Sequence, residues 1–205
     1  MLTWSCFIVS AYLIGSVPFG YLFARLFKRI DIREFGSHNI GATNVLRVVG
    51  PFPGLLTLAF DIGKGAVVVL LAKRCFPSFA MLPIIVGICA VCGHNFSIFL
   101  KGRGGKGVAT GFGVLVGLAP IVSFLTFLVW LFILLISRYI SLASLVGALA
   151  FPIFLWLKRA EFPLMTLGIF ISILVVIRHR ENIKRLIKGT EPKIRLPRPP
   201  KADSQ

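Results

Sequence analysis

Long runs of apolar residues alternate with short polar segments along most of this chain of 205 residues. A helix needs about 20 mainly apolar residues to cross a bilayer, and several of the runs approach or reach that length. They predict membrane helices over residues 3–25, 54–72, 79–100, 142–157 and 162–177. Pro18 predicts a break or kink within the first of these helices. Residues 34–53, which follow it, are expected to form a polar loop.

The apolar region 108–136 can be read in two ways. As one helix it would be about 43 Å long, against a hydrocarbon core of about 30 Å. As two shorter helices it would turn just before Pro120. Charge favours this hairpin, because it places the basic segment after Arg178 on the same side as the loops that carry Arg47 and Lys106, and cytoplasmic loops are enriched in cations.

The hairpin gives an all-α integral membrane protein with seven transmembrane helices, its N-terminus outside and its C-terminus cytoplasmic. The two arms of the hairpin are short for a full span, so we expect them to pack within the bundle. Gly113 and Gly117 have the spacing that lets two helices approach closely.

Composition agrees with this class. Hydrophobic residues make up 57% of the chain, mean hydropathy is +0.89, and 23 Lys and Arg residues face only 7 Asp and Glu residues. A soluble nucleic-acid-binding protein would carry such a charge on a basic face and would have far fewer apolar runs. Here the cations lie between membrane-length runs, so nucleic acid is not an expected partner.

The C-terminal part divides in two. Residues 180–188 place Ile183 and Leu186 opposite Lys184 and Arg185, a pattern that suits a helix lying on an anionic membrane surface. From Glu191 onward the prolines and scattered charges predict disorder. We therefore expect one membrane domain over residues 1–190 and a disordered, basic, proline-rich tail over 191–205.

The most informative polar stretch runs from residue 93 to 113 and combines many glycines with Lys101, Arg103 and Lys106. Successive glycines let backbone N–H groups point into one concavity, and cations beside such a nest favour an anion. The Walker pattern fails because Lys106 precedes Gly107 rather than Ser or Thr. We expect a phosphate to be held here, at the membrane surface. The alternative is a flexible loop without a ligand, whose cations only set the topology.

Other polar clusters are predicted at the same side of the membrane. The first, residues 36–47, is rich in groups that could orient a polyhydroxylated ligand, namely Ser37, Asn39, Thr43 and Asn44, and it ends at Arg47, which can grip a phosphate with two N–H groups. The second is His94 with Asn95, and the third is residues 178–182. The histidines lack the spacing or carboxylate partners of a zinc site, and no metal or cofactor is expected.

Asp61 and Lys64 stand inside a predicted membrane helix, three residues apart. Charges in the membrane are costly and by default suggest function. A structural ion pair that braces the site is the competing interpretation.

Two classes of function fit a cytoplasmic anion pocket beside an apolar bundle: a lipid-synthesis transferase with a phosphorylated substrate, or a small anion transporter. A transporter is expected to show internal repeats or helices broken near the midplane. No convincing repeat is visible, and the polar groups gather at one face. The pattern favours the enzyme.

At these same residues the chain resembles the bacterial acyl-phosphate:glycerol-3-phosphate acyltransferase (PlsY) family of the inner membrane. The resemblance extends from Gly15 to about Lys188. Its segments are G-S-V-P-F-G-Y (15–21), G-S-H-N-I-G-A-T-N-V-L-R (36–47), D-I-G-K-G (61–65), G-H-N-F (93–96), K-G-R-G-G-K-G-V-A-T (101–110), S-R-Y-I-S-L-A-S (137–144) and R-H-R-E-N-I (178–183). It implies transfer of a fatty acyl group from acyl phosphate to the 1-hydroxyl of glycerol 3-phosphate, giving lysophosphatidic acid, with membrane lipid as surroundings.

The resemblance also implies roles for individual residues. The catalytic residues would be Ser37, Arg47, Lys106, His179 and Asn182, with Glu181 as a structural neighbour. The substrate-binding residues would be Asn39, Gly41, Thr43, Asn44, Gly102, Gly104, Gly105, Gly107 and Ser144.

The implied chemistry needs no enzyme nucleophile, and the sequence contains no known nucleophile motif. Phosphate is already a good leaving group, so no enzyme nucleophile is required, and neither G-x-S-x-G nor the H-x-x-x-x-D pattern of other glycerolipid acyltransferases occurs. Positioning and charge neutralisation are left to the protein. For the proton of the attacking hydroxyl, His179 and a phosphate oxygen of the donor are both candidate acceptors.

Overall fold

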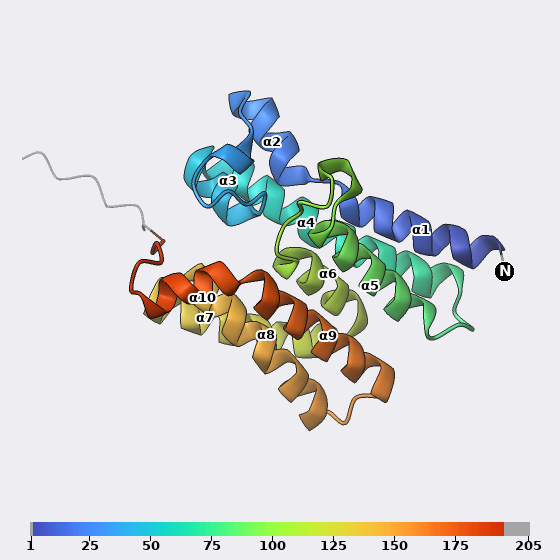
Figure 1. Ribbon diagram of the computed structural model, residues 1–205. Helices are drawn as coiled ribbons and strands as arrows, with labels where there is room; N and C mark the ends of the chain where they lie inside the picture. Colours follow the sequence, from blue (N-terminus) through green and yellow to red (C-terminus); the bar gives the residue numbers. More distant parts are fainter. Residues whose placement is uncertain (1, 195–205) are drawn as a thin grey trace, which may run out of the picture.

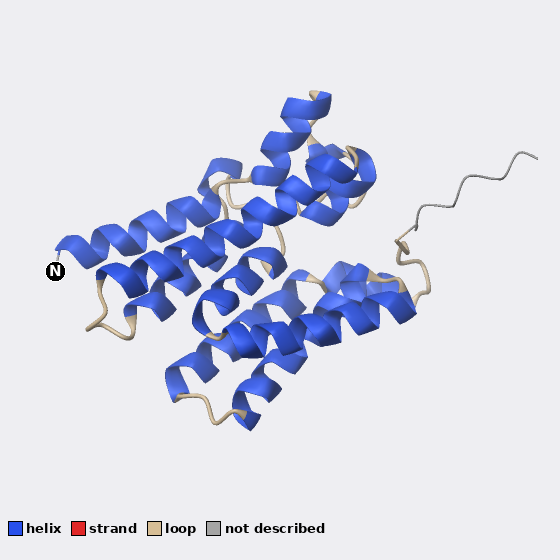
Figure 2. Cartoon of the chain, turned by 180° about the vertical axis from the view of Figure 1, so that it is seen from behind, coloured by secondary structure: helices blue, strands red, loops and turns tan. Residues whose placement is uncertain are grey.

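The computed structural model describes residues 2–194, and within this range the chain is helical, without strands (Figure 2). The elements are α1 (Leu2–Ser16), α2 (Phe19–Lys28), η1 (Ile32–Glu34), α3 (Ala42–Val48), α4 (Pro51–Cys75), α5 (Leu82–Asn95), η2 (Ile98–Leu100), α6 (Val108–Leu118), α7 (Pro120–Ser137), α8 (Ile140–Leu157), α9 (Phe162–Arg178) and α10 (Arg180–Ile187). The two short elements η1 and η2 are 3₁₀ helices. The all-α prediction is confirmed.

The first predicted helix is broken where Pro18 predicts it. α1 ends at Ser16 and α2 starts at Phe19, because proline has no N–H to continue the helical ladder. α2 ends at Lys28 and is capped by Arg29, which has a left-handed backbone (φ 57°) and whose N–H donates to the carbonyl of Arg25.

The prediction of one polar loop over residues 34–53 is wrong. This segment contains α3, and α4 already begins at Pro51. α3 starts after Gly41, and proline at the first position of α4 needs no hydrogen-bond partner for its nitrogen. Short helices of this kind escape a search for membrane-length apolar runs.

The hairpin over residues 108–136 is confirmed, with α6 and α7 joined at Ala119. α6 packs closely on α4 through glycines. A Cβ atom added to Gly113 would lie 2.0 Å from the carbonyl oxygen of Ile62, and one added to Gly65 would lie 2.2 Å from that of Thr110. The close-approach face expected at Gly113 is therefore the α4–α6 interface.

The long helices form two groups that α6 joins (Figure 1). α1, α4, α5 and α6 pack together, and α7, α8 and α9 form the second group. Apolar side chains of both groups meet in one core, which includes Leu82, Val86, Val114, Phe151 and Leu167. Large apolar side chains on the outer surface, such as Leu70, Phe132 and Ile153, are exposed and suit a lipid environment.

Within the described residues, five helical segments are long and apolar enough to cross a membrane: Trp4–Lys28, Pro51–Cys75, Leu82–Leu100, Pro120–Ser137 and Ile140–Leu157. α9 reaches that length only together with α10, which is bent from it by 59°, and α6 is shorter. The seven predicted spans correspond to helical segments, but the number that cross the bilayer stays a prediction.

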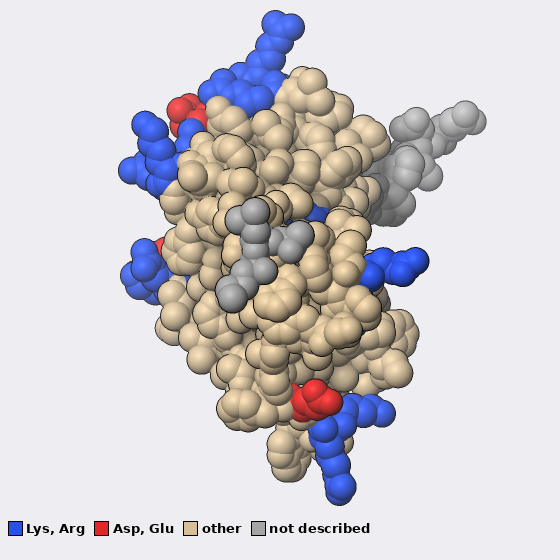
Figure 3. Space-filling model, turned by 90° about the vertical axis from the view of Figure 1, so that its right-hand side faces the viewer, with Lys and Arg blue, Asp and Glu red and all other residues tan. Residues whose placement is uncertain are grey.

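The polar connections gather at one end of the bundle. In Figure 1 the glycine-rich loop, α3 and α10 lie toward the end opposite the N-terminus. Viewed from the N-terminal end, the surface is mainly uncharged, with Lys and Arg side chains near its edges (Figure 3). Of the tail predicted to be disordered, Glu191–Ile194 are ordered, which corrects that prediction, and residues 195–205 lie outside the described residues.

We expect Gly113→Val to lower the melting temperature of the detergent-purified protein, because the new side chain would collide with the backbone of α4. Overpacking of this kind typically costs about 1–3 kcal/mol. Gly63→Val is the matched control on α4, since a Cβ there meets nothing within 4 Å. Equal melting temperatures for the two variants would show that the α4–α6 contact is not tight.

We also expect the C-terminus to be cytoplasmic and the N-terminus external, since cations concentrate at the end that carries the glycine-rich loop. Reporter fusions to each terminus measure this directly. A reporter at the C-terminus that is active only outside the cell would contradict the orientation.

Candidate active site

The glycine-rich loop is held by its own backbone rather than left open. The N–H groups of Gly102, Gly104 and Gly105 donate to the carbonyls of Ser97 (2.8 Å), Asn95 (3.2 Å) and His94 (3.0 Å), respectively. These three N–H groups are therefore not free for an anion.

Free donors lie a few residues further along, at the start of α6. Among the described residues, the N–H groups from Lys106 to Thr110 have no hydrogen-bond partner. They include the first turn of a helix, which carries a partial positive charge and binds anions readily. Gly107 caps this turn with φ 78°, and an added Cβ would lie 2.5 Å from Asn95 Nδ2, so only glycine fits. Within the loop that the sequence predicts to hold a phosphate, the free donors thus lie at its end, from Lys106 onward.

Arg178 fastens the loop to α9. Its Nη2 donates to the carbonyl of Gly104 at 3.0 Å, and Nε and Nη2 donate to that of Gly105 at 3.0 and 2.8 Å. Sequence reasoning placed Arg178 in a polar cluster without giving it this role. A guanidinium with several N–H groups is suited to holding two carbonyls at once.

Lys106 lies beside the start of α6 and its ammonium donates to Asn182 Oδ1. The side chain is partly buried. Burial lowers the pKa of Lys106 to about 8, with the Glu191 carboxylate opposing this and nearby guanidinium groups reinforcing it. The ammonium is therefore mostly charged at neutral pH, and it is less shielded by water than a surface lysine.

An amide relay sets the direction in which Asn182 points. Its Nδ2 donates to Glu191 Oε1 at 2.7 Å, which leaves Oδ1 to accept from Lys106. The Glu191 carboxylate is 6% exposed and also accepts from Ser141 Oγ and Arg185 Nε, both at 2.7 Å. Burial would raise the pKa of Glu191, but these hydrogen bonds outweigh it and hold the pKa below its usual value.

Glu191 is the residue that sequence reasoning missed. The sequence pattern predicts that it lies in a disordered tail, and the family resemblance implies a structural role for Glu181 instead. Glu181 is exposed and forms surface ion pairs with Arg180 and Lys184. Nothing in the sequence around Glu191 indicates that this segment folds back onto α8 and α10. Its contacts with Ser141, Asn182 and Arg185 are visible only in the three-dimensional structure.

His179 follows the last residue of α9 and is 3% exposed. Burial, reinforced by the charge of Lys106, lowers its pKa to about 4, so the ring is neutral at physiological pH. Nδ1 lies 2.8 Å from the carbonyl of Val175, which can only accept, so the ring proton is on Nδ1. Nε2 is then a free lone pair, as a general base requires.

The first polar cluster is largely self-supporting. The buried Asn44 accepts from the N–H of Ser37 at 2.9 Å and donates to the carbonyls of Phe35 and Asn39. Asn39 Oδ1 accepts from the N–H of Gly41 at 2.8 Å. The Asn44 amide and Asn39 Oδ1 thus shape the loop, whereas Asn39 Nδ2 has no hydrogen-bond partner among the described residues. The hydroxyls of Ser37 and Thr43 have no hydrogen bond within the described residues.

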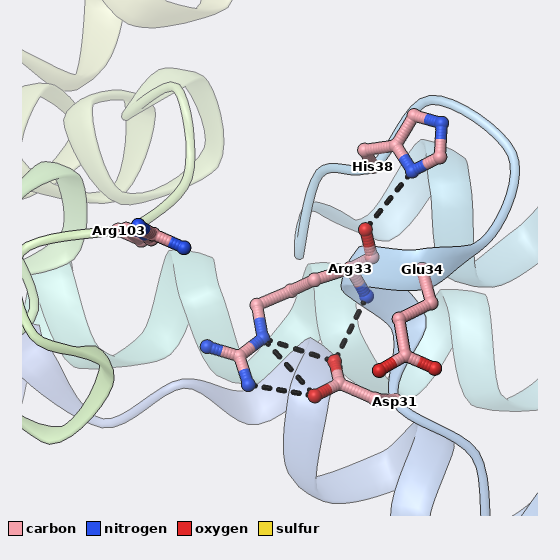
Figure 4. A pocket seen from close by; sticks show the side chains of 5 residues that line it. All are labelled: Asp31, Arg33, Glu34, His38 and Arg103. Carbon is pink, nitrogen blue, oxygen red and sulfur yellow. Dashed lines mark hydrogen bonds and ion pairs between the residues drawn. The ribbon is translucent and has the colours of Figure 1, made fainter.

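Arg47 joins this loop to the C-terminal segment. Its Nη2 donates to the carbonyl of Pro192 at 3.0 Å, next to Glu191. His38 of this loop, together with Asp31, Arg33 and Glu34 just before it, faces Arg103 of the glycine-rich loop across a cavity of about 350 Å³ (Figure 4). In that view Arg103 lies on one side and Arg33 and His38 on the other. The three sequence motifs therefore lie at one end of the bundle.

Ser144 is not joined to this network. Its Oγ donates to the carbonyl of Ile140 at 2.8 Å and accepts from Trp130 Nε1 at 3.3 Å. Ser141, one turn earlier on α8, contacts Glu191 instead. The structure thus brings together Arg47, Lys106, His179 and Asn182, and adds Ser141, Arg178 and Glu191.

The fold and site define a class: an integral membrane protein whose helices carry a cationic site with free N–H donors at one end. Comparison with known proteins gives the family. The family model for glycerol-3-phosphate acyltransferase matches residues 5–189, and the chain belongs to this family.

Relatives and solved structures agree. Glycerol-3-phosphate acyltransferase of Carboxydothermus hydrogenoformans is 46% identical over 90% of this chain and 93% of its own, and that of Desulforamulus reducens is 44% identical over 91% and 93%. Crystal structures of PlsY, an integral membrane glycerol 3-phosphate acyltransferase, are 38% identical and cover 94% of this chain and 96% of that one. Their TM-scores are 0.90 for the glycerol 3-phosphate form and 0.87 for the lysophosphatidic acid form.

We expect Lys106→Ala and Arg47→Ala each to lower acyltransferase activity by about 10²–10³, the usual loss when a charged contact to the transition state is removed. Lys101→Ala is the control, because this exposed lysine of the same loop has no partner among the described residues. Activity near that of the unmodified protein in both variants would remove Lys106 and Arg47 from the site.

Proposed function

We propose that the chain transfers a fatty acyl group from acyl phosphate to the 1-hydroxyl of glycerol 3-phosphate, at the cytoplasmic face of the inner membrane. The products are lysophosphatidic acid and inorganic phosphate. The observation that carries the proposal is the Lys106 ammonium beside the open N–H groups of α6, at the polar end of an apolar bundle. The glycerol 3-phosphate and lysophosphatidic acid forms of the related structures support the acceptor and the product.

Each substrate has a complementary region. The acyl chain of the donor is apolar and suits the lipid-facing helices, whereas its phosphate is an anion for Lys106 and the first turn of α6. Arg47 contacts the C-terminal segment and therefore lies at the same end of the bundle as Lys106. There its guanidinium can bind a second phosphate. Ser37 offers a free hydroxyl on the loop that carries Arg47.

The transfer needs no covalent enzyme intermediate. The 1-hydroxyl oxygen attacks the acyl carbonyl carbon, the bond from that carbon to the phosphate oxygen breaks, and phosphate leaves with the bonding electrons. The hydroxyl proton passes to His179 Nε2 or to an oxygen of the donor phosphate. Lys106 and the N–H groups of α6 neutralise the charge that develops on the leaving phosphate.

The relay from Glu191 through Asn182 keeps Lys106 aimed at that phosphate. An Asn amide that donates on one side and accepts on the other can hold an ammonium without neutralising it. Because Asn182 lies between them, Lys106 does not form a direct ion pair with Glu191. Its positive charge therefore stays available to the substrate.

We expect activity with palmitoyl phosphate and none with palmitoyl-CoA or palmitoyl carrier protein. A thioester donor carries a pantetheine arm, and recognising one usually needs a protein surface outside the membrane, which the short loops do not offer. Purified enzyme would be supplied with glycerol 3-phosphate and each donor separately, and lysophosphatidate would be measured.

Lys106→Ala serves as the inactive control for this assay. Comparable product from either thioester, with acyl phosphate absent, would show that the donor is not acyl phosphate. The glycerol-3-phosphate acyltransferase class would then stand, and only the donor would be reassigned.

A further inference from the structure

Three ionisable side chains are buried together in the bundle, outside the site described above. Asp61 is 2% exposed, Lys64 5% and His94 4%. Lys64 Nζ lies 2.8 Å from Asp61 Oδ1, 2.9 Å from the carbonyl oxygen of Val17 and 3.0 Å from His94 Nδ1. His94 Nδ1 also lies 3.6 Å from Asp61 Oδ1, so the three side chains form one buried cluster.

These contacts join three elements. Asp61 and Lys64 are on α4, His94 is on α5, and Val17 lies at the break between α1 and α2. Burying charges in a membrane is favourable only when they are paired and hydrogen-bonded. The ion pair with Asp61 and the contacts of Lys64 with Val17 and His94 therefore fix α4, α5 and the break relative to one another.

His94 connects this buried cluster to the glycine-rich loop. Because the Lys64 ammonium donates to Nδ1, the ring proton of His94 is on Nε2, the nitrogen on the far side from Lys64. Nε2 lies against Gly105, where an added Cβ would be only 2.1 Å away. The carbonyl of His94 also accepts from the N–H of Gly105 at 3.0 Å.

Gly105 is thus held from two directions, by His94 from within the bundle and by Arg178 through its carbonyl. The next residue is Lys106. We propose that Asp61, Lys64 and His94 form a charged brace that positions Gly105, and through it the Lys106 ammonium. The proposal rests on the role of Lys106 given under the proposed function, and it makes the three residues positioning residues rather than catalytic ones.

The test removes both charges at once, with the double variant Asp61→Asn/Lys64→Met, so that no unpaired charge is left in the bundle. We expect kcat/KM to fall by about 10–100-fold, since a shift of about 1 Å in a positioning group can cost about 10² in rate. Lys73→Met is the matched control, because Lys73 is also on α4 and donates to a backbone carbonyl, that of Gly117. This control should keep the activity of the unmodified enzyme.

The pH profile separates positioning from general loss of structure. Lys106 acts in its charged form, so activity falls as pH rises through its pKa of about 8. If the loop loosens, Lys106 gains water and its pKa rises toward the ordinary value, so the alkaline limb of kcat/KM moves to higher pH. The other groups that act on Lys106, which are Glu191, Arg185, Arg178, Arg47 and His179, are unchanged in the variant.

His94→Asn gives a second variant that keeps the ion pair. Asn Oδ1 can replace Nδ1 as the acceptor for Lys64, but the part of the ring that touches Gly105 is lost. We expect the same movement of the alkaline limb, with the melting temperature of the purified protein little changed. This variant decides the question where the double variant fails to fold.

Two results would overturn the brace. One is a folded His94→Asn or double variant whose kcat/KM and alkaline limb match those of the unmodified enzyme. The other is a loss of activity that only follows the folded fraction, with the alkaline limb in place. If Lys106→Met is itself active, the proposed phosphate site fails first and the brace has no target.

Discussion

The clamping of Gly104 and Gly105 is the interaction on which the site depends. The N–H groups of these residues bind carbonyls at the end of α5, and their carbonyls bind the guanidinium of Arg178 at the end of α9. With both faces of the peptide units engaged, the loop is rigid, although it is rich in glycine. It can therefore present Lys106 and the free N–H groups of α6 in one fixed arrangement, which reduces the reorganisation needed when a charged substrate binds.

The C-terminal segment closes the site from the other side. Glu191 ties α8 to α10 through Ser141 and Arg185, and the adjacent Pro192 accepts from Arg47 on α3. Residues separated by more than a hundred positions in the sequence thus meet at one end of the bundle. The carboxylate compensates part of the positive charge gathered there, so that Arg47, Lys106 and Arg185 can lie near one another before any phosphate is bound.

The all-helical fold was predictable because it follows from the pattern of apolar residues along the chain. The break at Pro18, the hairpin before Pro120 and the tight packing at Gly113 each rest on a local physical rule. The site was predictable only in part. The cationic loop was recognised, but which of its N–H groups are free depends on hydrogen bonds to Asn95 and His94, and pairings of that kind are not encoded in spacing. Glu191 was missed for the same reason, since its partners come from α8 and α10.

The location of the site follows from what the bilayer permits. Within the hydrocarbon, backbone groups must be satisfied inside helices, so free N–H donors for an anion can occur only at helix ends. α6 is short and begins beside Lys106, and it thereby places such an end at the level where an acyl chain meets water. In the proposed reaction, a donor with an apolar chain and an anionic head reaches this level by its own partitioning. The proposed transfer then needs only fixed cations and a neutral His179, rather than a covalent nucleophile, to direct the attack of a soluble phosphorylated alcohol.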